Sequence, residues 1–206
     1  MNRSTDTKGQ FGRCTLLATV LLFICPATVN AHLVSTGFGP FYDGIIHLTL
    51  SPDDLLAVIA VALLSGLLGA RNGRAVLLVL PSAWLIGGFF GLKIGGEVSF
   101  PVVNTLSFLV VGILVVADRK LPLGLVGGIA LLLGLLHGVL NGYAMVQAGG
   151  GFLSLVGIVT GVFVLVAIVA AFVVSLRAAW TRVAVRVAGS WITAIGLLML
   201  GWAFRR

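Results

Sequence analysis

The chain alternates long apolar stretches with short polar or glycine-rich segments along most of its 206 residues. Each apolar stretch is close to the roughly 20 residues that cross a bilayer as a helix. The stretches are Pro52–Ala70, Ala75–Leu92, Pro101–Ala117, Leu121–Tyr143, Phe152–Leu176 and Val187–Trp202. The segments between them are 71–74, 93–99, 118–120, 149–151 and 177–186. The pattern predicts an all-α integral membrane protein, a bundle of about six transmembrane helices.

The composition supports this class. Hydrophobic residues make up 59% of the chain and charged residues 9%, and the mean hydropathy is +1.17. Soluble domains carry about 25% charged residues, so this chain has too little polar surface to cover a water-soluble globule. The composition excludes a disordered chain, a coiled coil, a secreted disulfide scaffold and a soluble nucleic-acid binder. The lipid bilayer is therefore the expected partner, and no nucleic acid is.

Residues 1–31 have the features of a signal peptide. A basic segment, 1–13, precedes the apolar run Cys14–Ile24, and Val29-Asn30-Ala31 fits the small-x-small cleavage pattern. We expect cleavage before His32, which leaves 32–206 as a six-helix transmembrane domain; the alternative is an uncleaved signal anchor. Both cysteines of the chain lie in this segment, so a metal site in the mature protein would use nitrogen and oxygen ligands.

The basic residues predict the orientation. A cleaved signal peptide places His32 outside the cytoplasmic (inner) membrane, with a periplasmic mature N-terminus and a multi-pass chain. The inner segments then carry Arg71, Arg74, Arg119, Lys120, Arg177, Arg182 and Arg186, and the outer ones Lys93, Arg205 and Arg206. This agrees with the positive-inside rule. The two C-terminal arginines disagree, and an odd number of spans would explain them.

In the mature chain, acids and histidines gather on the opposite side, apart from Asp118. Ionisable groups in or near a membrane are costly and usually mark a pathway or a binding site. Asn141 joins them because it lies four residues after His137, on the same face of an otherwise apolar helix. The candidate metal ligands are therefore His32, Asp43, His47, Asp53, Asp54, Glu97, His137 and Asn141.

Several of these residues also have structural explanations. Ser51-Pro52-Asp53-Asp54 is typical of a helix start, with serine at the N-cap, proline at N1 and carboxylates in the first turn. Asp43 and His47 would share a face on a short helix, or lie in an interfacial loop. Glu97 would form a surface pair with Lys93. His32 would chelate a metal through its α-amine and imidazole only after cleavage.

Glycines recur four residues apart in three of the apolar stretches: 87, 91 and 95; 134, 138 and 142; 157 and 161. Small residues at this spacing let helix backbones approach closely in lipid. The spacing predicts a compact helical bundle rather than a chemical role for these glycines.

Two motifs carry a family resemblance. Residues 47–58 read HLTLSPDDLLAV and residues 137–142 read HGVLNG. They resemble H-P-x-x-G-x-D-H-L-L-A-M and H-G-x-x-H-G of the HupE/UreJ family, small membrane proteins encoded with hydrogenases and ureases and regarded as nickel or cobalt permeases. The resemblance runs through the whole mature chain. It implies a permease that takes up a divalent transition-metal ion, nickel or cobalt, from the outer face, with metalloenzyme-maturation proteins as partners.

The matches and departures identify the site residues that the resemblance implies. His47, Asp53 and His137 stand at matching positions. Asp54 and Asn141 stand where the family pattern has histidines, so two imidazoles are replaced by oxygen donors. Imidazole suits nickel, copper and zinc, whereas carboxylate and amide oxygens suit harder ions such as magnesium and manganese.

Two other classes of function compete with transport. One is a non-transporting accessory or scaffold protein, in which the polar residues serve as a helix cap and as interhelical hydrogen bonds. The other is an intramembrane enzyme; H-E-x-x-H and G-x-S-x-G motifs are absent from the sequence, and a hydrolase would have to use His47, Asp53 and His137. We expect no enzyme. The oligomeric state stays open.

Overall fold

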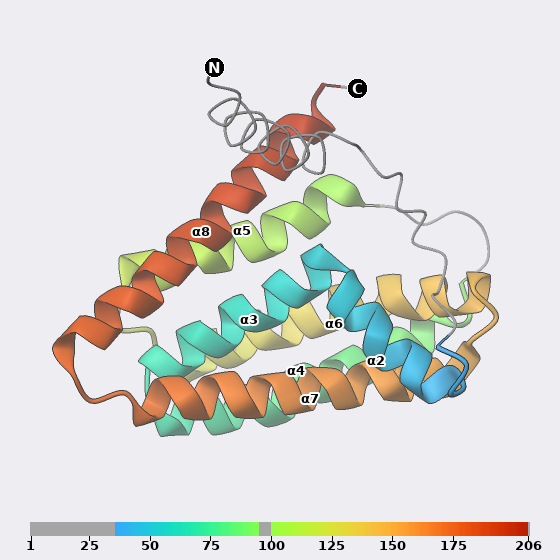
Figure 1. Ribbon diagram of the computed structural model, residues 1–206, viewed down its shortest axis with the longest axis horizontal. Coiled ribbons are helices and arrows are strands. Elements are labelled where there is room, and N and C mark those ends of the chain that lie inside the picture. Colours follow the sequence, from blue (N-terminus) through green and yellow to red (C-terminus); the bar gives the residue numbers. More distant parts are fainter. Residues whose placement is uncertain (1–35, 95–99, 206) are drawn as a thin grey trace, which may run out of the picture. The chain divides into compact units, whose positions relative to one another are not determined.

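The protein is described by a computed structural model over residues 36–94 and 100–205. These residues form seven helices and no strand (Figure 1). They are α2 (Pro40–Leu50), α3 (Pro52–Leu67), α4 (Ala70–Gly91), α5 (Pro101–Ala117), α6 (Leu123–Gln147), α7 (Gly151–Ser175) and α8 (Ala179–Ala203). The all-α prediction is confirmed for this part of the chain. The predicted signal peptide and the candidate ligands His32 and Glu97 lie outside the described residues.

The number of membrane spans differs from the prediction. Four helices, α4, α6, α7 and α8, are long and apolar enough to cross a membrane. Helices α2 and α3 pass the same test only together, as a pair bent by 77°, and α5 is a shorter apolar helix of 17 residues. Length and composition thus support four spans, or five if the bent pair counts as one. The predicted count of six is not confirmed.

The bend between α2 and α3 follows from the sequence around Ser51. Ser51 has an extended backbone, with φ −93° and ψ 98°, and Pro52 opens α3. A proline disfavours the helical conformation of the residue before it, while its fixed φ suits the first position of a new helix. The sequence left the segment with Asp43 and His47 open between a short helix and an interfacial loop, and the structure places both residues in the helix α2.

Two predicted connections are largely helical. Helix α4 begins at Ala70, directly after Gly69 with its φ of 99°, so residues 71–74 belong to the helix. Helix α8 begins at Ala179, and most of 177–186 is likewise helical. The prediction of polar loops was wrong here because arginine is a good helix former. Polar residues at these positions mark where a helix extends beyond the apolar region. The helix boundary itself lies at a residue with positive φ, here Gly69.

The glycine spacing produces close packing of α4 against α6. A Cβ at Gly138 would overlap the backbone carbonyl of Trp84, and one at Gly142 would overlap that of Gly88. On α7, a Cβ at Gly157 would overlap the carbonyl of Phe41 in α2. The prediction of close helix packing at these glycines is confirmed, since backbones meet where only a hydrogen atom fits.

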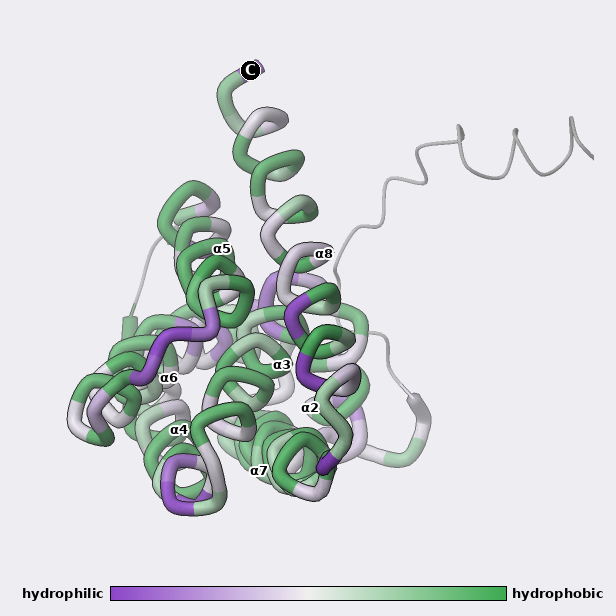
Figure 2. Tube along the Cα trace, turned by 90° about the vertical axis from the view of Figure 1, so that its left-hand side faces the viewer, coloured by the Kyte–Doolittle hydropathy of each residue, from purple (hydrophilic) through white to green (hydrophobic). Residues whose placement is uncertain are grey.

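Helix α3 lies at the centre of the bundle. It contacts α2, α4, α5, α6, α7 and α8, and its residues from Ala60 to Gly66 are all buried. Large apolar side chains such as Leu132, Ile168 and Trp191 are exposed instead on the outer helices, which are mostly hydrophobic along their length (Figure 2). The outside of the bundle is therefore suited to lipid, and the start of α3 places Asp53 and Asp54 among neighbouring helices.

Charged residues separate between the two ends of the helices. The connections 68–69, 118–122 and 176–178 all lie at the left-hand end in Figure 1. We call this the basic end; it holds Arg71, Arg74, Arg119, Lys120, Arg177, Arg182 and Arg186. The opposite end, where α2 meets α3, we call the acidic end; it holds Asp43, His47, Asp53 and Asp54. The separation predicted from the sequence is thus present among the described residues, with Asp118 at the basic end and Lys93 and Arg205 at the far ends of α4 and α8 as the exceptions.

Candidate functional site

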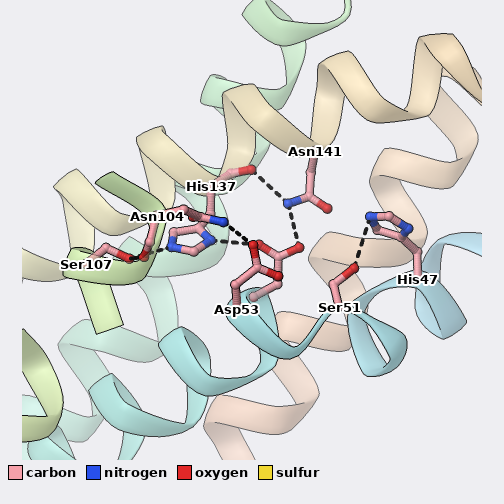
Figure 3. Close-up of polar contacts among 8 residues, drawn as sticks. His47, Ser51, Asp53, Asn104, Ser107, His137 and Asn141 are labelled. Carbon is pink, nitrogen blue, oxygen red and sulfur yellow. Dashed lines mark hydrogen bonds and ion pairs between the residues drawn. The ribbon is translucent and has the colours of Figure 1, made fainter. Parts of the chain in front are cut away.

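Asp54 lies at the centre of a buried polar cluster. The residue is in the first turn of α3 and is only 5% exposed. One of its oxygens, Oδ1, lies 2.7 Å from Nδ1 of His137, and the other, Oδ2, accepts a hydrogen bond of 2.9 Å from Nδ2 of Asn141. His137 and Asn141 lie one turn apart on the same face of α6, as their spacing predicts (Figure 3).

The His137 ring is fixed on three sides. It is fully buried and lies against the indole of Trp84, with ring centroids 5.3 Å apart. Its Nδ1 faces Asp54, and its Nε2 lies 2.9 Å from Oγ of Ser107. Asn141 also donates to the backbone carbonyl of His137, at 2.9 Å. The ring therefore has one orientation, with each nitrogen assigned to a different neighbour.

Helix α5 contributes two residues that the sequence analysis missed. Ser107 donates from Oγ to the carbonyl of Asn104 at 2.6 Å, and Nδ2 of Asn104 donates to Oδ2 of Asp53. Asp53 is thereby joined to α5 and Asp54 to α6. A usable indication was present in the sequence, because Asn104 and Ser107 are polar residues three apart in a helix that has only one other polar side chain, Thr105. Such a pair faces one neighbour in the bundle.

Ser107 and Asp54 lie on opposite sides of the buried His137 ring. Oγ of Ser107 is 2.6 Å from the Asn104 carbonyl and 2.9 Å from Nε2 of His137, and its single hydrogen can be donated to only one of them. On the other side, Nδ1 of His137 and Oδ1 of Asp54 are 2.7 Å apart and share a hydrogen bond. Pairing a buried acid with a buried histidine avoids the large cost of burying an isolated ion.

Some polar atoms of the cluster are left without a partner. Oδ1 of Asn141, Oδ1 of Asn104 and Nε1 of Trp84 are buried and make no hydrogen bond to the described residues. Leaving a buried polar group unsatisfied costs about 1–3 kcal/mol. Amide oxygens are also cation ligands. Two unsatisfied amide oxygens beside two carboxylates are therefore consistent with a ligand that completes the cluster.

The remaining predicted ligands make separate contacts. His47 lies on α2 near the bend, and its Nε2 is 3.4 Å from Oγ of Ser51. Asp43, one turn earlier on α2, accepts hydrogen bonds from the backbone N–H and the hydroxyl of Thr36, at 2.6 and 2.7 Å. The structure thus brings Asp53, Asp54, His137 and Asn141 together and leaves His47 and Asp43 in local contacts.

The helix-start pattern at Ser51 is correct in position but not in its hydrogen bonds. Ser51 is the N-cap of α3, yet its side chain makes no capping hydrogen bond. Asp54 accepts from α6, and Asp53 accepts from Asn104 on α5. Both carboxylates still lie at the positive end of the helix dipole, which favours negative charge. Their contacts to other helices are what the helix-start pattern did not predict.

The donor set is mixed. Among the described residues, no three His, Cys, Asp or Glu side chains are arranged to hold a metal ion. The cluster instead combines an imidazole, two carboxylates, two amides and a hydroxyl. A cation bound here would depend on the amide and hydroxyl oxygens as well as on the acids and the histidine.

The family is shown by the sequence comparison. The family model described as HupE / UreJ protein matches residues 19–199. The chain belongs to the HupE/UreJ family. No curated protein and no solved structure gives a match. The resemblance seen in the two motifs is thereby confirmed, and with it the family's character as membrane proteins.

The two departures from the HupE/UreJ motifs meet in space. Asp54 and Asn141 are the positions where the family pattern has histidines, and they are hydrogen-bonded to each other at 2.9 Å. The first motif supplies Asp53 and Asp54 on α3, and the second supplies His137 and Asn141 on α6. The motifs therefore form one cluster although they lie more than 80 residues apart in the chain.

Proposed function

We propose that this HupE/UreJ protein is a permease for a divalent transition-metal cation, of the nickel or cobalt type, in the cytoplasmic membrane. The observation that carries the proposal is the buried Asp54–His137 pair at the start of the central helix. Ionisable side chains inside a membrane protein are expensive, and they usually mark the path of an ion or a proton.

His137 is the expected cation ligand, through Nε2. Its other nitrogen faces Asp54, and a carboxylate at that position orients a metal-binding histidine and makes it more basic. On the Nε2 side lies Ser107, which is linked through Asn104 to Asp53. A cation would bind Nε2 only when that nitrogen carries no proton, because a histidine nitrogen binds metal in its deprotonated form.

The cation would enter at the acidic end. Asp43 and His47 lie there before the cluster, and carboxylates concentrate cations at a pore entrance. A set of mixed, individually weak ligands lets an ion leave as well as bind. We propose entry from the periplasmic side and release at the basic end, which the positive-inside rule assigns to the cytoplasm. Membrane potential or proton exchange, rather than ATP, would drive transport.

The substituted positions bear on which ion is carried. A cluster with one imidazole and several oxygens is harder than one with three imidazoles. We therefore propose that this protein accepts manganese more readily than a HupE/UreJ protein that has histidines at both motif positions.

We propose no enzymatic role. The arrangement of Ser107, His137 and Asp54 resembles a hydrolase triad, but the Asn104 carbonyl of the same helix competes with His137 for the hydroxyl hydrogen of Ser107. A serine nucleophile has to donate that hydrogen to the histidine.

The competing proposal is a scaffold that binds metalloenzyme-maturation proteins without transporting ions. It is favoured by one observation, namely that side chains of the cluster already pair with one another across α3, α5 and α6. Such bonds hold membrane helices together without any ligand.

Uptake into liposomes separates the two proposals. Purified protein is reconstituted and the uptake of nickel, cobalt and manganese is measured for the wild type, Asp54→Asn and His137→Gln. Asp54→Asn keeps the shape of the side chain and removes its charge. The matched control is Asp118→Asn, which removes a carboxylate from the basic end. We expect at least about tenfold lower uptake for the first two variants, because each loses a buried charged partner, and near wild-type uptake for the control.

Two results would contradict the permease proposal. Wild-type protein that folds but moves no cation would overturn the permease and leave the scaffold. Uptake that is equal in all four proteins would show that the cluster is not on the path.

A further inference from the structure

A hollow of about 300 Å³ lies at the basic end, remote from the cation cluster. The ends of α3 and α7 and the start of α8 line it, and its lining includes Gly69, Arg177, Ala178, Thr181 and Arg182. Asp54 precedes Gly69 by 15 residues along α3 and its end, so at 1.5 Å per residue the two sites are about 22 Å apart along the helix.

The hollow offers guanidinium groups. Arg177 is exposed and forms no ion pair with the described residues. Arg182 is held by Asp118, whose two oxygens accept from Nε and Nη2 at 2.6 Å each. This bidentate contact leaves both hydrogens of Nη1 available, because a guanidinium has five N–H donors. Asp118 thus fixes the direction of Arg182, while the charge of Arg177 stays uncompensated within the described chain.

The start of α8 adds backbone donors. Ala178 and Ala179 both line the hollow. Ala178 is the N-cap of α8, and no side chain caps the first N–H groups of this helix in the described structure. The N–H of Thr181 donates to the Ala178 carbonyl at 3.1 Å, which leaves the N–H groups of Ala179 and Trp180 at the positive end of the helix dipole. Together with the arginines they form an environment for an anion with several oxygens, such as a phosphate group.

Two tryptophans place the hollow at the level of lipid headgroups. Trp180 is 71% exposed beside the hollow, and Trp202 is 65% exposed near the other end of α8. They are 22 residues apart, which corresponds to about 33 Å of helix. The hydrocarbon core of a bilayer is about 30 Å thick, and exposed tryptophans favour its two boundaries. Trp191, which is 69% exposed, lies between these two tryptophans on α8. A bilayer whose boundaries coincide with Trp180 and Trp202 would place the hollow at the level of the lipid phosphates.

We infer that this hollow binds the phosphate group of an anionic membrane lipid, through Arg177, Nη1 of Arg182 and the N–H groups of Ala179 and Trp180. Basic pockets between transmembrane helices on the cytoplasmic side are suited to such headgroups. The site is independent of the proposed transport function.

Native mass spectrometry of the full-length protein in a neutral detergent tests the inference. The wild type is titrated with phosphatidylglycerol and with phosphatidylcholine, and the preference for the anionic lipid is compared in Arg177→Gln and Arg177→Lys. The matched control is Arg71→Gln, an exposed arginine at the same end that does not line the hollow. We expect Arg177→Gln to lose about fivefold in preference, the size expected for one basic residue near anionic lipid, and Arg71→Gln to lose little.

Inorganic phosphate distinguishes a lipid from a soluble source. The lipid assignment predicts that millimolar phosphate displaces phosphatidylglycerol weakly. If phosphate instead binds in an Arg177-dependent way and phosphatidylglycerol shows no preference, the lipid assignment is overturned. Equal losses in Arg177→Gln and Arg71→Gln would overturn the site itself, since general surface charge would then explain binding. Should Arg177→Gln fail to fold, Arg177→Lys keeps the charge without the planar fork and should bind the anionic lipid with reduced preference.

Discussion

The acidic and basic ends of this bundle use charged residues in opposite ways. At the acidic end, Asp54 and His137 are buried and satisfy each other. At the basic end, the Asp118–Arg182 pair is partly open to its surroundings, with the Arg182 side chain 52% exposed. Buried partners depend on each other because a lone charge cannot be solvated. Exposed ones contribute little to stability but interact with whatever lies outside the protein.

Asp54→Leu should have the largest effect on the contrast between buried and exposed charges. The substitution leaves His137 and Asn141 buried without their partner, so we expect a loss of about 3–5 kcal/mol in the free energy of unfolding. Denaturation of the purified protein in detergent, followed by circular dichroism, measures it. Asp54→Asn, which keeps an acceptor oxygen, should lose less. A loss below about 1 kcal/mol for Asp54→Leu would contradict the mutual dependence of the pair.

Backbone contact at glycine comes next in size. Gly138→Ala places a methyl group against the Trp84 carbonyl, and overpacking of this kind costs about 1–3 kcal/mol. Gly127→Ala, on the same helix with open space around its Cβ position, is the matched control; alanine is the better helix former, so this change should be neutral or stabilising. Thermal unfolding in detergent compares the two, and equal effects would count against close α4–α6 packing.

Ser107→Ala tests whether α5 contributes to the buried cluster. It removes the hydrogen-bond partner of Nε2 of His137, and leaving a buried polar group unsatisfied costs about 1–3 kcal/mol. Ser190→Ala is the control, because that serine is exposed and bonds only to a carbonyl of its own helix. Unfolding and cation uptake should both weaken for Ser107→Ala and neither for Ser190→Ala. An unchanged Ser107→Ala protein would remove α5 from the site.

Arg182→Gln should have the smallest effect on stability. An exposed ion pair contributes about 0–1 kcal/mol, even with the bidentate geometry seen here. The effect should shrink further in high salt, since salt screens exposed charges. Unfolding at low and high ionic strength checks this. A loss comparable to that of Asp54→Leu would mean that the two ends do not differ in the way described.

The helices themselves were largely predictable from the sequence. Helix α5 was predicted with the bounds that the structure shows, Pro101–Ala117, because a proline opens it and a polar segment follows it. Helix α2 was only one of two alternatives, since 11 residues with mixed polarity give no decisive periodicity. The starts of α4 and α8 were misplaced because arginines at a helix end look like a loop in a hydropathy pattern.

The candidate site was predictable in part. His137 and Asn141 share a face by spacing alone, and the acids of α3 were identified by their scarcity. Asn104 and Ser107 were missed because polar residues without charge did not stand out as candidate ligands. His47 carries the family motif, yet the bend at Ser51 leaves it in contact with that serine rather than with Asp54.

The sequence by itself determined the class of protein, most of the helices, the separation of charge between their ends and the family. These depend on local composition and spacing, which the chain states directly. Only the tertiary structure decided the partners: that Asp54 meets His137 across 83 residues, that α5 completes the cluster, and that a hollow forms beside Arg177. The reason is that a side chain's partner depends on how each helix is rotated and packed against its neighbours, which many weak contacts decide together.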